Sequence, residues 1–193
     1  MTDNEKVRQS LHTLLTQAEI DFEMWKAMRN ARADPEVTVM LNRRYARFYI
    51  AAENGLFNSL VTILYKLFET RPDTVNFRQL IKMLPEDMDS GIKEEIDALM
   101  RVTKETWLKV VQVRNKVVGH QSMIESVEDV YREAGISICE LEEMVKNAQK
   151  LLVLVAGKFH DTHVVFNLKG TAAFDNLLGD LRASPAWRPG RNS

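Results

Sequence analysis

The amino-acid sequence predicts an all-α protein, a four-helix up-and-down bundle with short additional helices. Eight glycines and five prolines in 193 residues leave few turns, and this scarcity favours long helices. Apolar side chains recur at three- and four-residue spacing through most of the chain, which is the period of amphipathic helices. Because the connections between these stretches are short, helices that follow one another should run antiparallel.

The first two long helices are predicted from their start signals and their apolar stripes. Asp3 or Asn4 is expected to cap the first helix. A restart at Asp34 and Pro35 then opens a second long helix that runs towards Thr70. The buried stripe of the first helix is expected to comprise Leu11, Leu14, Leu15, Ala18, Phe22, Trp25 and Met28.

Residues 42–49 of the second helix are both basic and aromatic, with Arg43, Arg44 and Arg47 among three aromatic side chains. Such a mixture is able to bind nucleic acid through phosphate contacts and base stacking. We favour the alternative, in which a solvated basic face covers aromatic side chains that belong to the core. Residues 56–68, which follow, are apolar on nearly all sides and are expected in the interior.

Two more long helices complete the predicted bundle. The third begins near Ile92 and continues into residues 110–121. A capping box between Ser137 and Glu140 opens the fourth, which ends near Gly157. Short helices are expected at residues 77–84, 129–135 and 172–181, residues 164–166 are the only strand-like run, and residues 183–193 form a flexible C-terminal tail after a single domain over residues 1–182.

Composition limits the kinds of function that the chain supports. The formal net charge is -1, so any contact with nucleic acid must come from a local basic patch. No apolar run approaches the roughly 18 residues of a membrane span, and the polar start lacks a signal-peptide core, so we expect a cytoplasmic protein without membrane contact. The single cysteine, Cys139, is expected to be inert and buried or half-buried, and it fits a reducing compartment.

No pattern in the sequence predicts a cofactor or a metal. There is no glycine-rich phosphate loop, no paired-cysteine motif and no nucleophile elbow. His160, Asp161 and His163 lie close together, but two histidines and one acid lack the rest of a coordination shell.

Residues 110–121 are the stretch with the most chemical content. Trp107, Val111, Arg114 and Val118 fall on one helical face, so Arg114 is expected among core residues, where an arginine needs a partner. Glu53 is a candidate for that partner, and a purely structural role for Arg114 would follow from the pairing. Gly119 is expected to end the helix and to leave His120 free to turn towards the arginine.

A guanidinium beside an imidazole supports cleavage of an RNA phosphodiester without a metal. Arg114 would bind phosphate oxygens and stabilise the charge that develops on them. His120 would move the proton of the 2′-hydroxyl or of the leaving oxygen.

The segment from Arg114 to His120 resembles the R-x4–6-H motif of the HEPN superfamily (higher eukaryotes and prokaryotes nucleotide-binding). Asn115 matches the polar residue that follows the arginine, and the motif lies late in the third long helix of an all-α chain. The similarity extends over about residues 35–160. Residues 135–141 resemble the branch associated with abortive infection in bacteria.

This resemblance implies a homodimer that acts as a metal-independent endoribonuclease in a toxin–antitoxin or phage-defence setting. Arg114, His120 and Asn115 would be catalytic, and Lys116 and Ser122 would bind the substrate RNA. In a dimer, Arg114 of one chain could work with His120 of the other. An antitoxin or a nucleotidyltransferase is implied as a partner, although Ser122 replaces the tyrosine that such a transferase modifies in some toxin members. The alternative is a non-catalytic HEPN-like module that binds RNA, a nucleotide or a protein.

Overall fold

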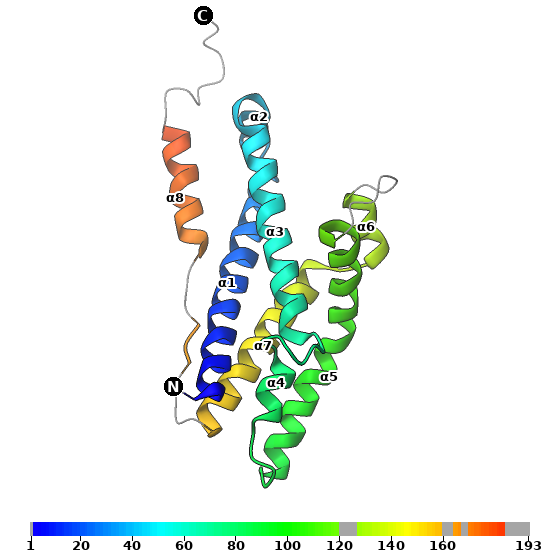
Figure 1. The fold of residues 1–193 in the computed structure, drawn as a ribbon. Helices are drawn as coiled ribbons and strands as arrows, with labels where there is room; N and C mark the ends of the chain where they lie inside the picture. The colour runs from blue at the N-terminus through cyan, green and yellow to red at the C-terminus, as the bar shows by residue number, and fades with distance from the viewer. Residues whose placement is uncertain (1, 120–126, 160–163, 167–169, 184–193) are drawn as a thin grey trace, which may run out of the picture.

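The computed structural model describes residues 2–119, 127–159, 164–166 and 170–183, and every regular element in these ranges is helical (Figure 1). The all-α prediction is therefore confirmed. The elements in chain order are α1 (Asp3–Ala31), α2 (Pro35–Met40), the π-helix η1 (Leu41–Tyr45), α3 (Ala46–Phe68), α4 (Phe77–Lys82), α5 (Ser90–Val113), the π-helix η2 (Arg114–Gly119), α6 (Val127–Ala134), α7 (Ile138–Phe159) and α8 (Gly170–Ala183).

The four long helices contact one another in a ring, in which α1 touches α3 and α7, and α5 touches the same two helices. Figure 1 shows α1 and α5 running in one direction and α3 and α7 in the other. Each helix turns one apolar stripe inward, and the stripes form the main core. Its largest fully buried side chains are Phe77, Leu11, Leu15, Leu60, Leu64, Leu67, Leu80, Ile96, Leu141, Met144, Leu151 and Leu152.

A second, smaller core lies at the end of the molecule where α2, η1 and the start of α3 meet α1 and α8. Phe174 and Leu178 of α8 pack there with Met28 of α1 and Tyr49 of α3. An ion pair between Arg182 and Asp34, at 2.8 Å, holds the far end of α8. The expected short helix at residues 172–181 is thus α8, which extends two residues further at each end.

Capping explains most helix starts. Pro35 follows its N-cap Asp34, Asn76 accepts a hydrogen bond from the backbone N–H of Gln79, and Ser137 forms the predicted capping box with Glu140. The predicted cap of the first helix, Asp3 or Asn4, is wrong. Thr2 caps α1, because its hydroxyl accepts from the Glu5 backbone while the Glu5 carboxylate accepts from the Thr2 backbone.

Three further expectations differ from the structure. The second long helix is not a uniform α-helix, because the π-helix η1 separates α2 from α3. Residues 164–166 form no strand, since no other extended segment lies among the described residues to pair with them. Cys139 is exposed rather than buried, because it lies in the first turn of α7, outside the buried stripe.

Several predictions fall on residues that the structure does not describe. The tail after Ala183 and the group of His160, Asp161 and His163 lie outside the described ranges. Within those ranges, no group of histidine, cysteine or acidic side chains is arranged to hold a metal ion. None of the described helices is long and apolar enough to cross a membrane.

Candidate functional site

Arg114 lies at the point where α5 ends and the π-helix η2 begins. The sequence predicted a continuous α-helix here, turning about 100° per residue. A π-helix closes its hydrogen bonds from i to i+5 and is wider than an α-helix, so residues 114–119 face other directions than a uniform α-helix would give them. Short π-helical segments are frequent at functional sites.

The guanidinium of Arg114 lies over an aromatic ring of α3. Its Cζ atom is 4.9 Å from the centroid of the Tyr65 ring, within the range of a cation–π contact. Tyr65 in turn stacks on Trp107 of α5, with the ring centroids 6.4 Å apart and the planes 21° from parallel. The Trp107 indole also donates to the backbone carbonyl of Tyr65, at 3.2 Å. The aromatic pair thus fixes the platform on which the arginine rests.

The hydrogen-bonding capacity of Arg114 is mostly unused within the described residues. One Nη atom donates to the side-chain carbonyl of Asn115, at 3.1 Å, and Nε is buried without an acceptor among the described residues. A guanidinium carries five N–H donors and remains charged at any physiological pH. Arg114 is half-buried and has no carboxylate beside it among the described residues. It is therefore a positioned cation able to take an anionic ligand.

The proposed pair between Glu53 and Arg114 is wrong. Glu53 is buried and accepts from Arg32 at 2.9 Å, with Arg29 at 3.6 Å. Glu53 precedes Tyr65 by twelve residues on α3, which corresponds to about 18 Å along the helix axis. The carboxylate therefore lies too far along α3 to reach the guanidinium above Tyr65.

Lys116, predicted to bind substrate, is already paired. Its ammonium lies 2.6 Å from the Glu133 carboxylate and connects η2 to α6. Lys109 makes a second connection on the same side, donating to Glu140 and to the backbone carbonyl of Gly135. These two lysines hold α6 and the start of α7 against the end of α5.

The structure thus brings together part of the predicted site. Arg114 and Asn115 are in contact, whereas His120 and Ser122 lie outside the described residues. Tyr65 was missed as a site residue, because the sequence placed it within an apolar stretch expected in the interior. The available signal was its hydroxyl, since a half-buried tyrosine in such a stretch often lies at the edge of the core.

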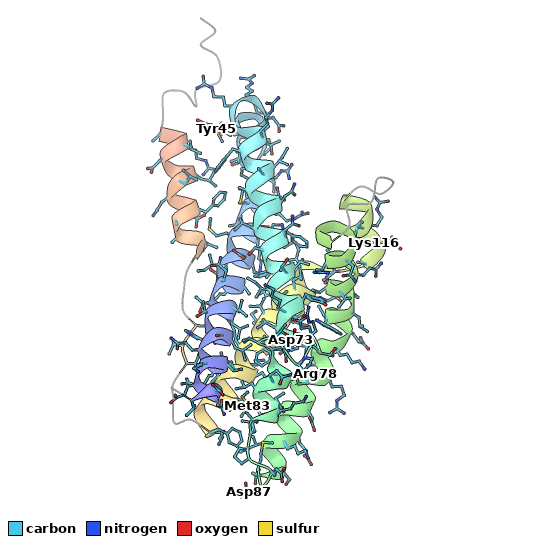
Figure 2. All side chains as sticks on the ribbon, viewed as in Figure 1. Tyr45, Asp73, Arg78, Met83, Asp87 and Lys116 are labelled. Atoms are coloured by element: carbon cyan, nitrogen blue, oxygen red, sulfur yellow. The ribbon has the colours of Figure 1, made fainter. Side chains whose placement is uncertain are left out.

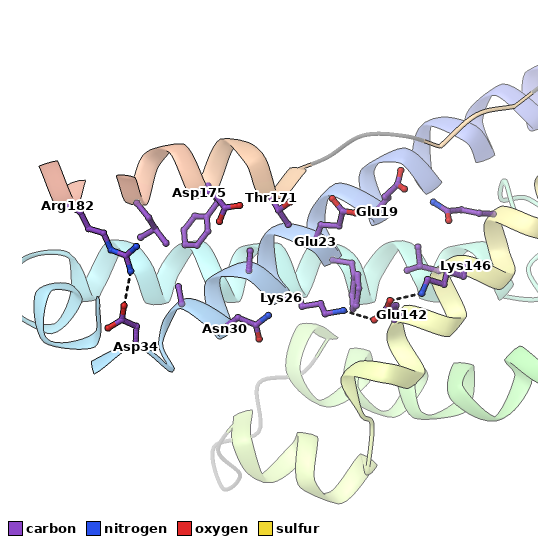
Figure 3. Close-up of a pocket in the computed structure, with 17 residues that line it drawn as sticks. Glu19, Glu23, Lys26, Asn30, Asp34, Glu142, Lys146, Thr171, Asp175 and Arg182 are labelled. Atoms are coloured by element: carbon purple, nitrogen blue, oxygen red, sulfur yellow. Dashed lines mark hydrogen bonds and ion pairs between the residues drawn. The ribbon is translucent and has the colours of Figure 1, made fainter. Parts of the chain in front are cut away.

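A groove of about 630 Å³ lies on another side of the molecule, between α1, α7 and α8 (Figure 3). Its carboxylates outnumber its cations, and Lys26 and Lys146 both pair with Glu142, each at 2.6 Å. These lysines hold the pKa of Glu142 at about 2, through hydrogen bonds from Lys146 and then Lys26. Burial raises the pKa of Glu19 in the same groove. Such a lining disfavours a polyanion.

A second cavity, of about 490 Å³, is entirely apolar and lies between α1, η1, α3 and α8. Its wall includes Tyr45 and Tyr49, and Tyr49 donates its hydroxyl to the backbone carbonyl of Met28. Burial, followed by the charge of Glu53, raises the pKa of Tyr49 to about 12. This tyrosine is therefore a neutral structural donor.

The all-α fold, with an arginine held at the end of a bundle helix, is consistent with the HEPN-like fold expected from the sequence. The family model HEPN_AbiU2, described as AbiU2, matches residues 4–181, and the chain belongs to this family of the abortive-infection branch. Comparison with curated proteins gives no match, and neither does comparison with solved structures.

Proposed function

We propose that this protein is a metal-independent endoribonuclease of HEPN type that acts as a homodimer in phage defence or as a toxin with an antitoxin or nucleotidyltransferase partner. One observation carries the proposal. Arg114 lies on the Tyr65 ring with most of its donors uncommitted among the described residues. A guanidinium in this state suits a phosphodiester, whose oxygens accept its parallel N–H donors.

The proposed mechanism divides the work between two groups. Arg114 binds the scissile phosphate and stabilises the charge that builds on its oxygens in the transition state. Asn115 accepts from Arg114 and so restricts the orientation of the guanidinium plane. His120 either accepts the proton of the 2′-hydroxyl as that oxygen attacks the phosphorus, or donates a proton to the oxygen that leaves the phosphorus, since an imidazole titrates near neutral pH. In the dimer, Arg114 of one chain works with His120 of the same chain or of the partner.

Cleavage of a labelled RNA in the presence of EDTA tests the proposal. We expect Arg114→Ala and His120→Ala each to lower the rate by at least about 10²-fold, the usual effect of removing a charge-stabilising donor or a general acid–base. Arg101→Ala, an exposed arginine earlier on α5, is the matched control and should leave the rate unchanged. Full activity in either site variant, with the fold intact by circular dichroism, would remove Arg114 or His120 from the mechanism.

Two further measurements separate the alternatives. Light scattering should give twice the monomer mass of 22.2 kDa for the wild type and for both site variants. Overexpression should arrest growth, and His120→Ala should relieve the arrest. RNA binding without any turnover would instead support the non-catalytic module.

A further inference from the structure

We propose that the exposed face of η1 and α3 is a binding track for single-stranded RNA that leads to Arg114. This inference rests on the proposed function, because it supplies the path by which an RNA substrate reaches that site. The track is defined by Arg43, Arg44 and Arg47 at one end and by Tyr65 with Arg114 at the other, and Figure 2 labels Tyr45 at the arginine end and Lys116 near the other.

The charge on this face is positive and is not neutralised by the described residues. Arg43, Arg44 and Arg47 are all exposed, and none forms a hydrogen bond or an ion pair with a described residue. The only acidic residue in η1 and α3 is Glu53, which is buried and bound by arginines of the α1 end. A chain with a net charge of -1 thus carries a local basic patch, which is the electrostatic requirement for binding RNA.

An exposed aromatic residue follows Arg47 in the sequence, and its ring lines the edge of the apolar cavity between α3 and α8. Phe48 is 68% exposed, contrary to the expectation that the aromatic side chains of this segment belong to the core. Tyr45 is half-buried and Tyr49 is buried, so Phe48 is the ring among the three that is most open to a base. Arginines beside an exposed aromatic ring are typical of surfaces that bind single strands, where the bases stack and the phosphates contact cations.

The geometry of α3 connects the two ends of the track. Arg47 and Tyr65 are eighteen residues apart, about five helical turns, so they share one face at a separation of about 27 Å. Between them the same face carries Ala51, Asn54, Asn58 and Thr62, which are small or polar and at least partly exposed, and Val61, which is buried. A stacked strand rises roughly 3.4 Å per nucleotide, so about eight nucleotides span this distance.

The surface along the track is open, and it carries no exposed acidic side chain from η1 or α3. Beside this face, a Cβ atom added at Gly55 would meet nothing within 4 Å. The polar side chains of Asn54 and Asn58 can hydrogen-bond sugar and base groups without selecting a sequence. We therefore expect binding that depends on strand length and salt more than on sequence.

A second copy of the chain is the competing occupant of this face. In a two-fold symmetric interface the same patch meets itself, and here that would bring unpaired arginines against arginines. Like charges facing each other across an interface oppose association. A polyanion has the complementary charge, and the observations favour RNA for that reason.

Fluorescence anisotropy with a fluorescein-labelled 12-nucleotide single-stranded RNA tests the track directly. Binding is measured in a His120→Ala background so that the probe stays intact. We expect Arg43→Ala/Arg44→Ala/Arg47→Ala to weaken binding at least about 10-fold. The slope of log K against log salt concentration should become shallower by about 2, since each phosphate contact contributes about 0.7 to it. Phe48→Ala should weaken binding by about 5-fold or more, the loss of one stacked base.

The matched control removes the same number of charges elsewhere. Arg78→Ala/Arg101→Ala/Lys104→Ala changes three exposed cations on α4 and α5, and should alter the affinity by less than about 2-fold. Equal loss in both triple variants would show a response to net charge and would overturn the track. A change in the mass of the track variant without a loss of RNA affinity would assign the face to a second copy, and would also overturn it.

Kinetics with two substrate lengths distinguish this inference from the proposed nuclease activity. With His120 intact, the triple arginine variant should raise KM for the 12-nucleotide RNA and leave cleavage of a trinucleotide unchanged, because a trinucleotide is too short to reach the patch. If the wild type cleaves and the triple variant has the same KM for the 12-nucleotide RNA, the track is overturned and the nuclease activity is not. RNA binding through the arginines without cleavage would support the track and overturn the nuclease.

Discussion

The outer face of α3 and the groove between α1, α7 and α8 differ in how their charges are used. In the groove, each of the three lining cations, Lys26, Lys146 and Arg182, is paired with a carboxylate of the same groove. On the α3 face, the arginines of residues 43–47 have no such partner among the described residues. Two surfaces of one nearly neutral chain thus have opposite electrostatic character.

This difference shows why net charge is a poor guide to the partner. A cation that is paired with a carboxylate of the protein attracts a polyanion only weakly. An unpaired arginine binds a phosphate and releases the counterions of the nucleic acid. The separation also keeps the acidic side chains of the groove away from the α3 face. The comparison can be tested by changing charged residues on the α3 face and in the groove.

The largest expected effect is at the end of the α3 face, in Arg114→Lys. Lysine keeps the positive charge but loses the planar fork and the extended contact with the Tyr65 ring. We expect RNA cleavage to fall by about 10²-fold, while affinity for the 12-nucleotide RNA changes by less than about 3-fold. Single-turnover rates and anisotropy measure the two quantities separately. Unchanged cleavage would mean that charge alone suffices at this position.

The next largest effect concerns Glu53, the buried acid beneath the α3 face. Glu53→Gln removes the charge that Arg29 and Arg32 share, and both arginines are about half exposed, so the loss is smaller than for a fully buried pair. We expect the free energy of unfolding in urea to fall by about 1–2 kcal/mol. Glu105→Gln, an exposed acid on α5, is the control and should change it by less than about 0.5 kcal/mol. A Glu53→Gln variant as stable as the control would show that the ion pairs contribute nothing.

A smaller effect is expected from Glu142 in the groove. Its pKa is lowered to about 2 from 4.5, so its contribution to stability is present above about pH 4.5 and is lost as the pH falls towards 2. Because Lys26 and Lys146 are substantially exposed, we expect that contribution to be about 1 kcal/mol. Urea unfolding between pH 6 and pH 3 should show a shallower decline in Glu142→Gln than in the wild type. Glu143→Gln, its exposed neighbour, should keep the wild-type profile.

The smallest expected effect is on RNA affinity, when two carboxylates of the groove are replaced by amides. Glu19→Gln/Asp175→Asn removes two carboxylates from the groove lining, away from the α3 face. Because the proposed track lies on another side of the bundle, RNA affinity at about 0.15 M salt should change by less than about 2-fold. A gain of 10-fold or more would mean that the groove lies close to the bound RNA, and the contrast between the two regions would fail.

The sequence by itself determined the helices and most of their ends. The three- and four-residue period located α1, α3, α5 and α7, and local side-chain chemistry located the start of α2 at Pro35 and the capping residue Ser137 before α7. These features depend on residues within one or two turns of each other, so they can be derived without knowing what lies opposite. The predicted motif residues Arg114 and Asn115 are neighbours in the sequence, and their contact is local for the same reason.

Only the tertiary structure decided which residues meet across helices. In the tertiary structure, Glu53 pairs with arginines at the end of α1, Tyr65 and Trp107 lie beneath Arg114, and Phe48 is exposed. The structure also has π-helical segments at η1 and η2, where the sequence predicted a uniform α-helix. The physical reason is that pairing and exposure depend on the neighbouring helix and its axial offset, which the period of a single helix does not contain.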